Sequence, residues 1–97
     1  MDRATLLAKK CLKRLEQPFD DWEAECFRRT CGFLEFGAIR GAASSWNAMI
    51  LPPGRRSEVS SGRPPAAPMT PTDADRLRRR LVRLIETQAL PDERLAG

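Results

Sequence analysis

The sequence predicts an all-α fold, a small bundle of three to four helices with a Pro/Gly/Ser-rich linker before the C-terminal helix. Three observations predict it. Apolar residues recur at the three-and-four spacing of a helix face near both ends of the chain. The 97 residues, 41% of them hydrophobic, are enough for one small domain or a domain plus a tail. Residues 52–69 block helical hydrogen bonding and offer almost nothing to bury. We therefore divide the chain into an N-terminal helical region (1–51), a flexible linker (52–69) and an arginine-rich helix with a tail (70–97).

The first helix is predicted to end before Pro18, because proline disfavours helical geometry at the residue before it. Its apolar face and its cationic face lie on opposite sides, so the helix is amphipathic. The apolar face consists of Ala4, Leu7, Ala8, Cys11, Leu12 and Leu15, and the cationic face of Lys9, Lys10 and Lys13.

The second helix is predicted to begin after Asp20 or Asp21, either of which can cap it, with Glu23 or Glu25 complementing its positive end. Apolar residues cover about half of its circumference, so we expect it to be the most buried element. Glycines between positions 37 and 41 predict that it ends or kinks there. A short third helix is expected from 44 to 51, halted by two prolines.

The C-terminal helix has the clearest start, since Thr70 supplies a capping hydroxyl, Pro71 a first-turn proline and Asp73 a first-turn carboxylate. Pro91 is expected to end it. Because a flexible linker precedes it, we expect this helix to be undocked in the free protein and to lock onto a partner or the body only in a complex. One stripe is apolar (Leu77, Leu81, Leu84 and Ile85), and another is cationic (Arg76, Arg79, Arg80 and Arg83).

The composition argues against most familiar enzymes. There is no histidine, which removes the commonest general base and metal ligand. The clustered acids at 16–25 are explained by helix capping, and no glycine loop of the phosphate-binding kind is present. The cysteines at 11, 26 and 31 match no zinc-site spacing, and we expect them to act as small buried hydrophobes. We expect a protein with no catalytic residues, no metal and no cofactor.

The expected location is intracellular and soluble, without a distinction between cytoplasm and nucleus. The start of the chain leads into a charged helix, not an apolar signal segment, and no apolar run approaches the length of a membrane span. An organelle-targeting or membrane-surface role for the first helix stays a minor alternative, because Asp2 and Glu16 are unusual in a transit peptide.

The function we favour is that of a small regulator or adaptor that binds a larger protein. The apolar inventory exceeds what such short helices readily hide, so part of it should meet a partner, and a homodimer is one form this can take. The partner-binding residues we expect are Trp22, Trp46 and Met49 for apolar anchoring, with Arg76, Arg79, Arg80 and Arg83 for charge pairing.

Four alternatives remain open. The arginine stripe could be only a solvated face that keeps the C-terminal helix soluble while its leucine stripe packs on the core. A nucleic-acid-binding regulator would use the same four arginines together with Lys9, Lys10 and Lys13 on phosphates. A helix-turn-helix over 35–50 would direct Ser44, Ser45 and Asn47 at bases. The arginine helix could instead be neutralised, in the same chain or in a second copy, by an acidic cluster formed by Glu16, Asp20, Asp21, Glu23 and Glu25.

Overall fold

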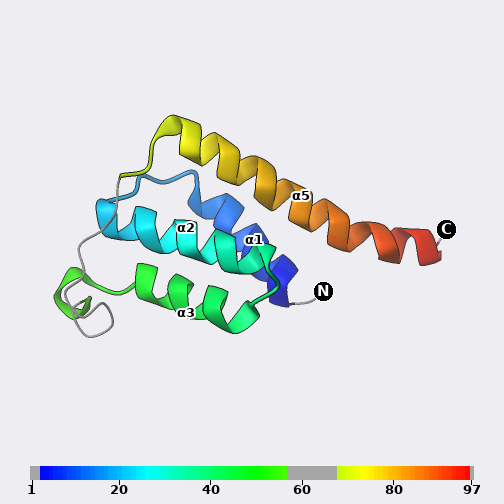
Figure 1. Ribbon diagram of the computed structural model, residues 1–97, viewed down its shortest axis with the longest axis horizontal. Coiled ribbons are helices and arrows are strands. Elements are labelled where there is room, and N and C mark those ends of the chain that lie inside the picture. Colours follow the sequence, from blue (N-terminus) through cyan, green and yellow to red (C-terminus); the bar gives the residue numbers. More distant parts are fainter. Residues whose placement is uncertain (1–2, 57–67, 97) are drawn as a thin grey trace.

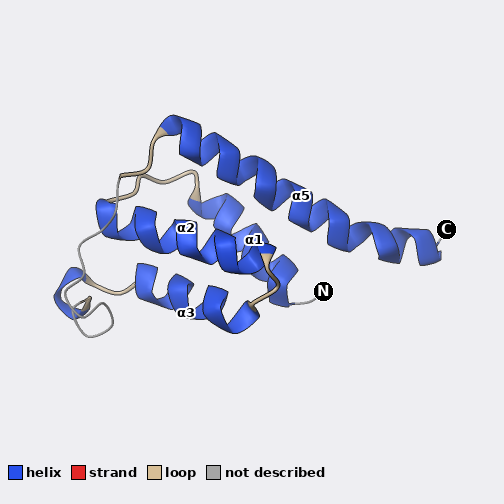
Figure 2. Cartoon of the chain, viewed as in Figure 1, coloured by secondary structure: helices blue, strands red, loops and turns tan. Residues whose placement is uncertain are grey.

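The computed structural model describes residues 3–56 and 68–96, with side chains through residue 87. It confirms the all-α fold class, with helices and connecting loops throughout the described ranges (Figure 2). The two most extensive helix contacts are those of α2 with α3 and of α1 with α5, so the bundle is built from two helix pairs. The elements in chain order are α1 (Arg3–Arg14), α2 (Asp21–Glu35), α3 (Ile39–Met49), the 3-10 turn η1 (Pro53–Arg55) and α5 (Pro71–Ala96).

The core lies between these pairs, with α5 on the opposite side of α1 and α2 from α3 (Figure 1). Its largest fully buried side chain is Phe27 of α2, whose ring meets that of Phe19 at a centroid distance of 5.0 Å. Thr30 is buried as well, and its hydroxyl donates to the carbonyl of Cys26 at 2.8 Å, so no hydrogen bond is lost there. None of the helices described is both long and apolar enough to cross a membrane.

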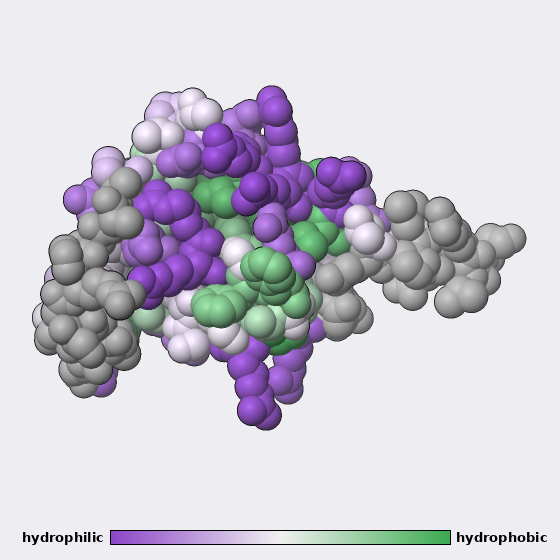
Figure 3. Space-filling view, in the orientation of Figure 1, coloured by the Kyte–Doolittle hydropathy of each residue, from purple (hydrophilic) through white to green (hydrophobic). Residues whose placement is uncertain are grey.

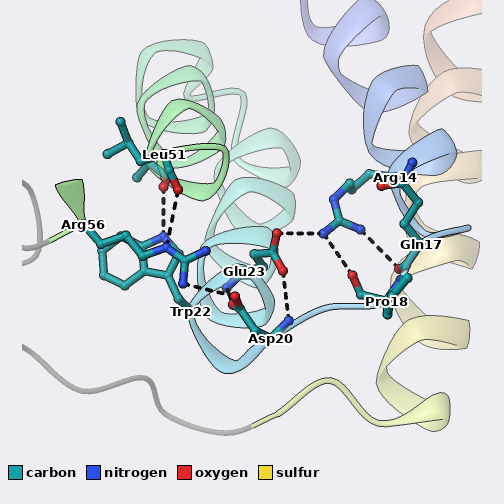
Figure 4. Close-up of polar contacts among 9 residues, drawn as sticks. Arg14, Gln17, Pro18, Asp20, Trp22, Glu23, Leu51 and Arg56 are labelled. Carbon is teal, nitrogen blue, oxygen red and sulfur yellow. Dashed lines mark hydrogen bonds and ion pairs between the residues drawn. The ribbon is translucent and has the colours of Figure 1, made fainter. Parts of the chain in front are cut away.

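The turn from α1 to α2 is held by Arg14. Helix α1 ends before Pro18, as predicted. The Arg14 guanidinium donates to the carbonyls of Gln17 at 3.2 Å and Pro18 at 3.0 Å, and pairs with Glu23 at 3.1 Å (Figure 4). It also lies 4.2 Å from the centroid of the Phe19 ring. One side chain therefore satisfies carbonyls after α1 and an acid in the first turn of α2.

The predicted cap of α2 is confirmed as a full capping box. The Asp20 carboxylate accepts from the backbone N–H of Glu23 at 2.7 Å, and the Glu23 carboxylate accepts from the backbone N–H of Asp20 at 2.9 Å. Burial alone would raise the pKa of Asp20, but the Glu23 N–H and the Arg56 guanidinium outweigh it and hold that pKa below its ordinary value.

The turn from α2 to α3 corrects the predicted start of the third helix, which is Ile39 and not Ser44. Gly37 ends α2 with a φ of +74°, a left-handed conformation that suits glycine. Gly41 neither ends nor kinks a helix. It lies inside α3, and the ring of Phe33 packs on it. A Cβ at Gly41 would stand 2.7 Å from Cδ1 of that ring. Two glycines in one short interval thus have different uses.

The segment after α3 is ordered further than the sequence predicted. Residues 53–55 form η1, and the Arg56 guanidinium donates to the carbonyl of Leu51 at 3.4 Å and pairs with Asp20 at 3.1 Å. It also lies 5.6 Å from the ring of Trp22. The start of the predicted linker is therefore fastened to the beginning of α2 (Figure 4), while residues 57–67 lie outside the described residues.

Helix α5 starts as predicted, with the Thr70 hydroxyl accepting from the backbone N–H of Asp73 at 3.0 Å. The expectation that it is undocked is wrong, since Leu77 and Leu81 are buried in the core that α1 and α2 share. The expectation that Pro91 ends it is also wrong, because the helical backbone continues to Ala96. Proline removes one backbone hydrogen bond, whereas extending an existing helix adds one bond per residue on either side.

Candidate functional site

The surface that stands out is apolar and lies where α2 turns into α3. Phe36 is 89% exposed and Phe33 is 39% exposed, with Ile39 partly buried beside them. We call these three residues the apolar corner. Figure 3 shows hydrophobic surface over this turn, below the hydrophilic surface of α5. The local fold produces the exposure: Phe36 is the last residue before Gly37, while the ring of Phe33 is held against Gly41.

The second feature is the arginine face of α5, which consists of Arg76, Arg79, Arg80 and Arg83, all exposed. Arg79 pairs with Asp75 of its own helix at 3.0 Å. Arg80 pairs with Glu35 of α2 at 3.3 Å. Within the described part of the chain, Arg76 and Arg83 have no ion pair. Because Glu35 directly precedes Phe36, the Arg80 contact joins the arginine face to the apolar corner.

The predicted apolar anchors belong to the interior. Met49 is wrong as a surface anchor, since its side chain is fully buried. Trp22 is partly buried, and its indole N–H donates to the carbonyl of Ala48 at 2.9 Å, which fastens α2 to the end of α3. Trp46 is partly buried against the same core. The Trp22 contact is typical of an aromatic ring with a polar N–H at a helix interface that offers a carbonyl nearby. Use of Trp22 and Trp46 in partner binding stays a prediction.

The apolar corner was missed as a site, although a signal for it existed in the sequence. Phe33 and Phe36 are three residues apart, so they share one helix face. Gly37 follows immediately, and glycine commonly ends a helix. A helix that ends at this glycine leaves the last residue of that face without a neighbouring turn to cover it.

The lysine face of α1 is where the sequence places it. Lys9, Lys10 and Lys13 are exposed, and within the described residues they form no ion pair. Helix α1 contains no acidic residue, and both of its last-turn cations, Lys13 and Arg14, suit a helix C-terminus. Since α1 packs on α5, the two cationic helices form one pair of the bundle.

The acidic cluster does not receive the arginine face. Glu23 pairs with Arg14, and Asp20 pairs with Arg56. Glu25 pairs with two arginines of its own helix, at 3.2 Å and 3.3 Å. The cations that neutralise this cluster therefore come from α1, α2 and the segment after α3. The arginine face of α5 stays available, apart from the Arg79 and Arg80 pairs.

The three thiols lie in the core and are free, as expected of small hydrophobes. A hydrogen bond between the side chains of Cys31 and Cys11, together with burial, raises the pKa of the Cys31 thiol, and burial raises that of Cys26. These shifts favour neutral, unreactive thiols. A search of the described residues finds no group of three or more cysteine and acidic side chains that could hold a metal.

The helix-turn-helix alternative gains little from the geometry. Helices α2 and α3 are indeed joined by a glycine turn, and Ser44 and Asn47 are exposed on α3. Arg40, however, is the one cation on α3, so this helix offers little to a phosphate backbone. Comparisons with known proteins add no assignment: no family model, no curated protein and no solved structure matches the chain.

Proposed function

We propose that this protein is a small non-enzymatic regulator or adaptor that binds a larger protein through the apolar corner and the arginine face. The observation that carries the proposal is the position of Phe36. A phenylalanine that is 89% exposed stands next to Glu35, which pairs with an arginine of α5. Aromatic side chains, phenylalanine among them, and arginine are enriched at protein–protein interfaces.

The energetics also support this use of Phe36. Covering an exposed phenylalanine stabilises a complex by about 1.5–3 kcal/mol through burial alone. Phe33 is already held against Gly41, so only one ring of the corner must be ordered on binding. Because this apolar surface is already formed where α2 and α3 meet, binding through it costs little conformational entropy.

A matched pair of variants tests the proposal. Phe36→Ser removes the most exposed ring of the apolar corner, whereas Ile50→Ser removes an apolar side chain that is 61% exposed at the opposite end of α3. The immobilised protein is used to capture proteins from an extract of the cells that make it. The captured proteins are identified by mass spectrometry and purified, and each is titrated against both variants by calorimetry. We expect a purified partner whose affinity falls for Phe36→Ser and holds for Ile50→Ser. Equal binding to both variants by every purified candidate would contradict the proposal.

A second function, binding of nucleic acid, is favoured by a different observation. Within the described residues, Arg76 and Arg83 of α5 and the lysine face of α1 have no ion pairs. Phosphate binding through them would lose affinity steeply as salt rises. Titration of labelled duplex DNA, single-stranded DNA and RNA at low and high salt tests it, with Arg76→Glu/Arg83→Glu as the variant. Salt-steep binding that this variant abolishes and Phe36→Ser retains would favour nucleic acid over protein.

A further inference from the structure

We propose that the occupant of this surface is an acidic amphipathic helix of the partner protein. Its apolar stripe would cover Phe33 and Phe36, and its carboxylates would face Arg76, Arg80 and Arg83. This inference rests on the proposed function and adds the chemical class of the partner. It is carried by the charge and spacing of the arginine face beside the apolar corner.

The charge of the surface points to an acidic partner from outside this chain. Helix α1 has no acidic residue, and α5 presents four exposed arginines on this face, two of them without an ion pair among the described residues. Three acids of the chain are a poor match, because Asp20, Glu23 and Glu25 are already paired with arginines elsewhere. A symmetric contact that seats this surface on the same surface of a second copy would also set one arginine face against the other, which like charges oppose.

The spacing of the arginines matches a helix better than an extended peptide. Residues 76, 80 and 83 lie at offsets of four and seven along α5, about 6 and 10.5 Å along the axis at 1.5 Å per residue. A neighbouring helix with acids at the same offsets presents all three carboxylates on one face. An extended chain rises about 3.3 Å per residue, so the 6 Å spacing falls near two residues on one face, but the 10.5 Å spacing falls near three residues, on the opposite face.

The neighbours of the arginines argue against a phosphate ligand. Arg80 is paired with Glu35 and Arg79 with Asp75. Arg76 and Arg83 are therefore the two arginines of this face that have no ion pair among the described residues. Specific nucleic-acid contacts commonly use about 6–10 phosphates. A partner that contributes both apolar side chains and a few carboxylates satisfies the whole surface.

The probe is a fluorescent synthetic peptide of about 18 residues, with leucines on one helical face and glutamates elsewhere. A peptide of the same composition, scrambled so that no apolar face forms, is its control. Anisotropy titrations use the full-length protein, and amide chemical shifts map where the peptide lies. We expect perturbations at residues 33–39 and 76–83, and at least about tenfold weaker binding of the scrambled peptide.

Variants separate the two parts of the surface. We expect Phe36→Ser and Arg76→Glu/Arg83→Glu each to weaken binding of the peptide at least about tenfold. Ile50→Ser and Lys9→Glu/Lys13→Glu, which alter exposed apolar and cationic residues outside this surface, should change it less than about threefold. Circular dichroism melting confirms that each variant folds.

Other outcomes overturn the inference. The inference fails if the peptide does not bind in a Phe36-dependent way, if the scrambled peptide binds as tightly as the designed one, or if the chemical-shift perturbations are confined to α1. Phe36-dependent binding of single-stranded RNA or of phosphatidylserine vesicles in preference to the peptide also overturns it, and identifies a base or a lipid as the occupant. If a purified partner depends on Phe36 while the peptide fails, the proposed function stands and the acidic-helix inference falls.

Discussion

The α2–α3 pair and the α1–α5 pair are held together by different kinds of contact. The first pair is joined by a tight glycine turn and by contacts at both ends, with Phe33 on Gly41 at one end and the Trp22 indole on the Ala48 carbonyl at the other. The two helices of the second pair are far apart in the chain, with α2 and α3 between them, and their contact buries small residues of α1 together with Leu77 and Leu81. The α2–α3 pair is therefore held by local chain connection as well as by packing, whereas the α1–α5 pair depends on packing.

The two pairs also differ in what they present to solvent. The α2–α3 pair exposes the apolar corner, while its acids are largely matched by arginines. The α1–α5 pair exposes cations, of which the lysine face, Arg76 and Arg83 have no ion pair within the described residues. Apolar and cationic surfaces meet at the Glu35–Arg80 contact. We therefore expect substitutions inside either helix pair to change stability, and substitutions where the two pairs meet to change binding.

The largest effect on stability is expected at the centre of α2. Phe27 is fully buried, so Phe27→Ala should lower the free energy of unfolding by about 3–5 kcal/mol through lost burial and a cavity. Urea denaturation followed by circular dichroism measures it. A loss below about 1 kcal/mol would mean that α2 is not the centre of the core.

The next effect concerns the docking of α5. Leu81 is fully buried, and Leu81→Ala should cost about 3 kcal/mol and release α5 before the α2–α3 pair unfolds. Amide hydrogen exchange checks this. We expect protection at residues 77–85 in the wild type, lost in the variant while residues 24–34 of α2 stay protected. Fast exchange at 77–85 in the wild-type monomer would show instead that the pair is not formed in the free protein.

A smaller effect is expected at Gly41, where the ring of Phe33 packs against α3. Gly41→Ala places a methyl group 2.7 Å from the Phe33 ring, so the ring must move at a cost of about 1–3 kcal/mol. Gly32→Ala is the control, because a Cβ there meets nothing within 4 Å. Thermal melting should show a lower Tm for the Gly41 variant alone. Equal melting temperatures would indicate that Phe33 does not lie on α3.

The capping box predicts a pH-dependent contribution of Asp20 to stability; removing an aspartate N-cap altogether usually costs about 1 kcal/mol. The folded-state pKa of Asp20 lies below its ordinary value of 3.8, so its contribution is present above that value and is lost as the pH falls through the folded-state pKa. Asp20→Ala should therefore destabilise α2 at neutral pH and lose its effect in acid. Asp20→Asn, which keeps a cap acceptor, should cost less. Urea denaturation across pH 2–7 measures both, and a pH-independent difference would exclude the carboxylate as the cause.

Sequence reasoning succeeded where the determining interactions are local. The Asp20 and Thr70 caps are each made within three residues, so residue type and position sufficed to predict the Thr70 cap and to narrow the cap of α2 to Asp20 or Asp21. The buried leucines of α5 followed from helical periodicity. The early start of α3 did not, because Gly41 is explained only by the ring that packs on it from another helix.

The candidate site was harder to predict because exposure depends on tertiary packing. Nothing in the sequence alone shows that Trp22 and Phe36 differ in exposure. The structure separates them through a carbonyl 26 positions away that accepts from the Trp22 indole, whereas Phe36 is 89% exposed. The arginine face was found from spacing alone, but the pairing of Arg80 with Glu35, which ties it to the apolar corner, required the fold.

The central claim is that the apolar corner is surface in the folded protein and serves binding rather than stability. The free energy of unfolding of Phe36→Ser, measured by urea denaturation, tests it without knowledge of the partner. Because the ring is 89% exposed, we expect a value within about 0.5 kcal/mol of the wild type. A loss of about 2 kcal/mol or more, as for a buried phenylalanine, would show that Phe36 is covered within the molecule and would contradict the account.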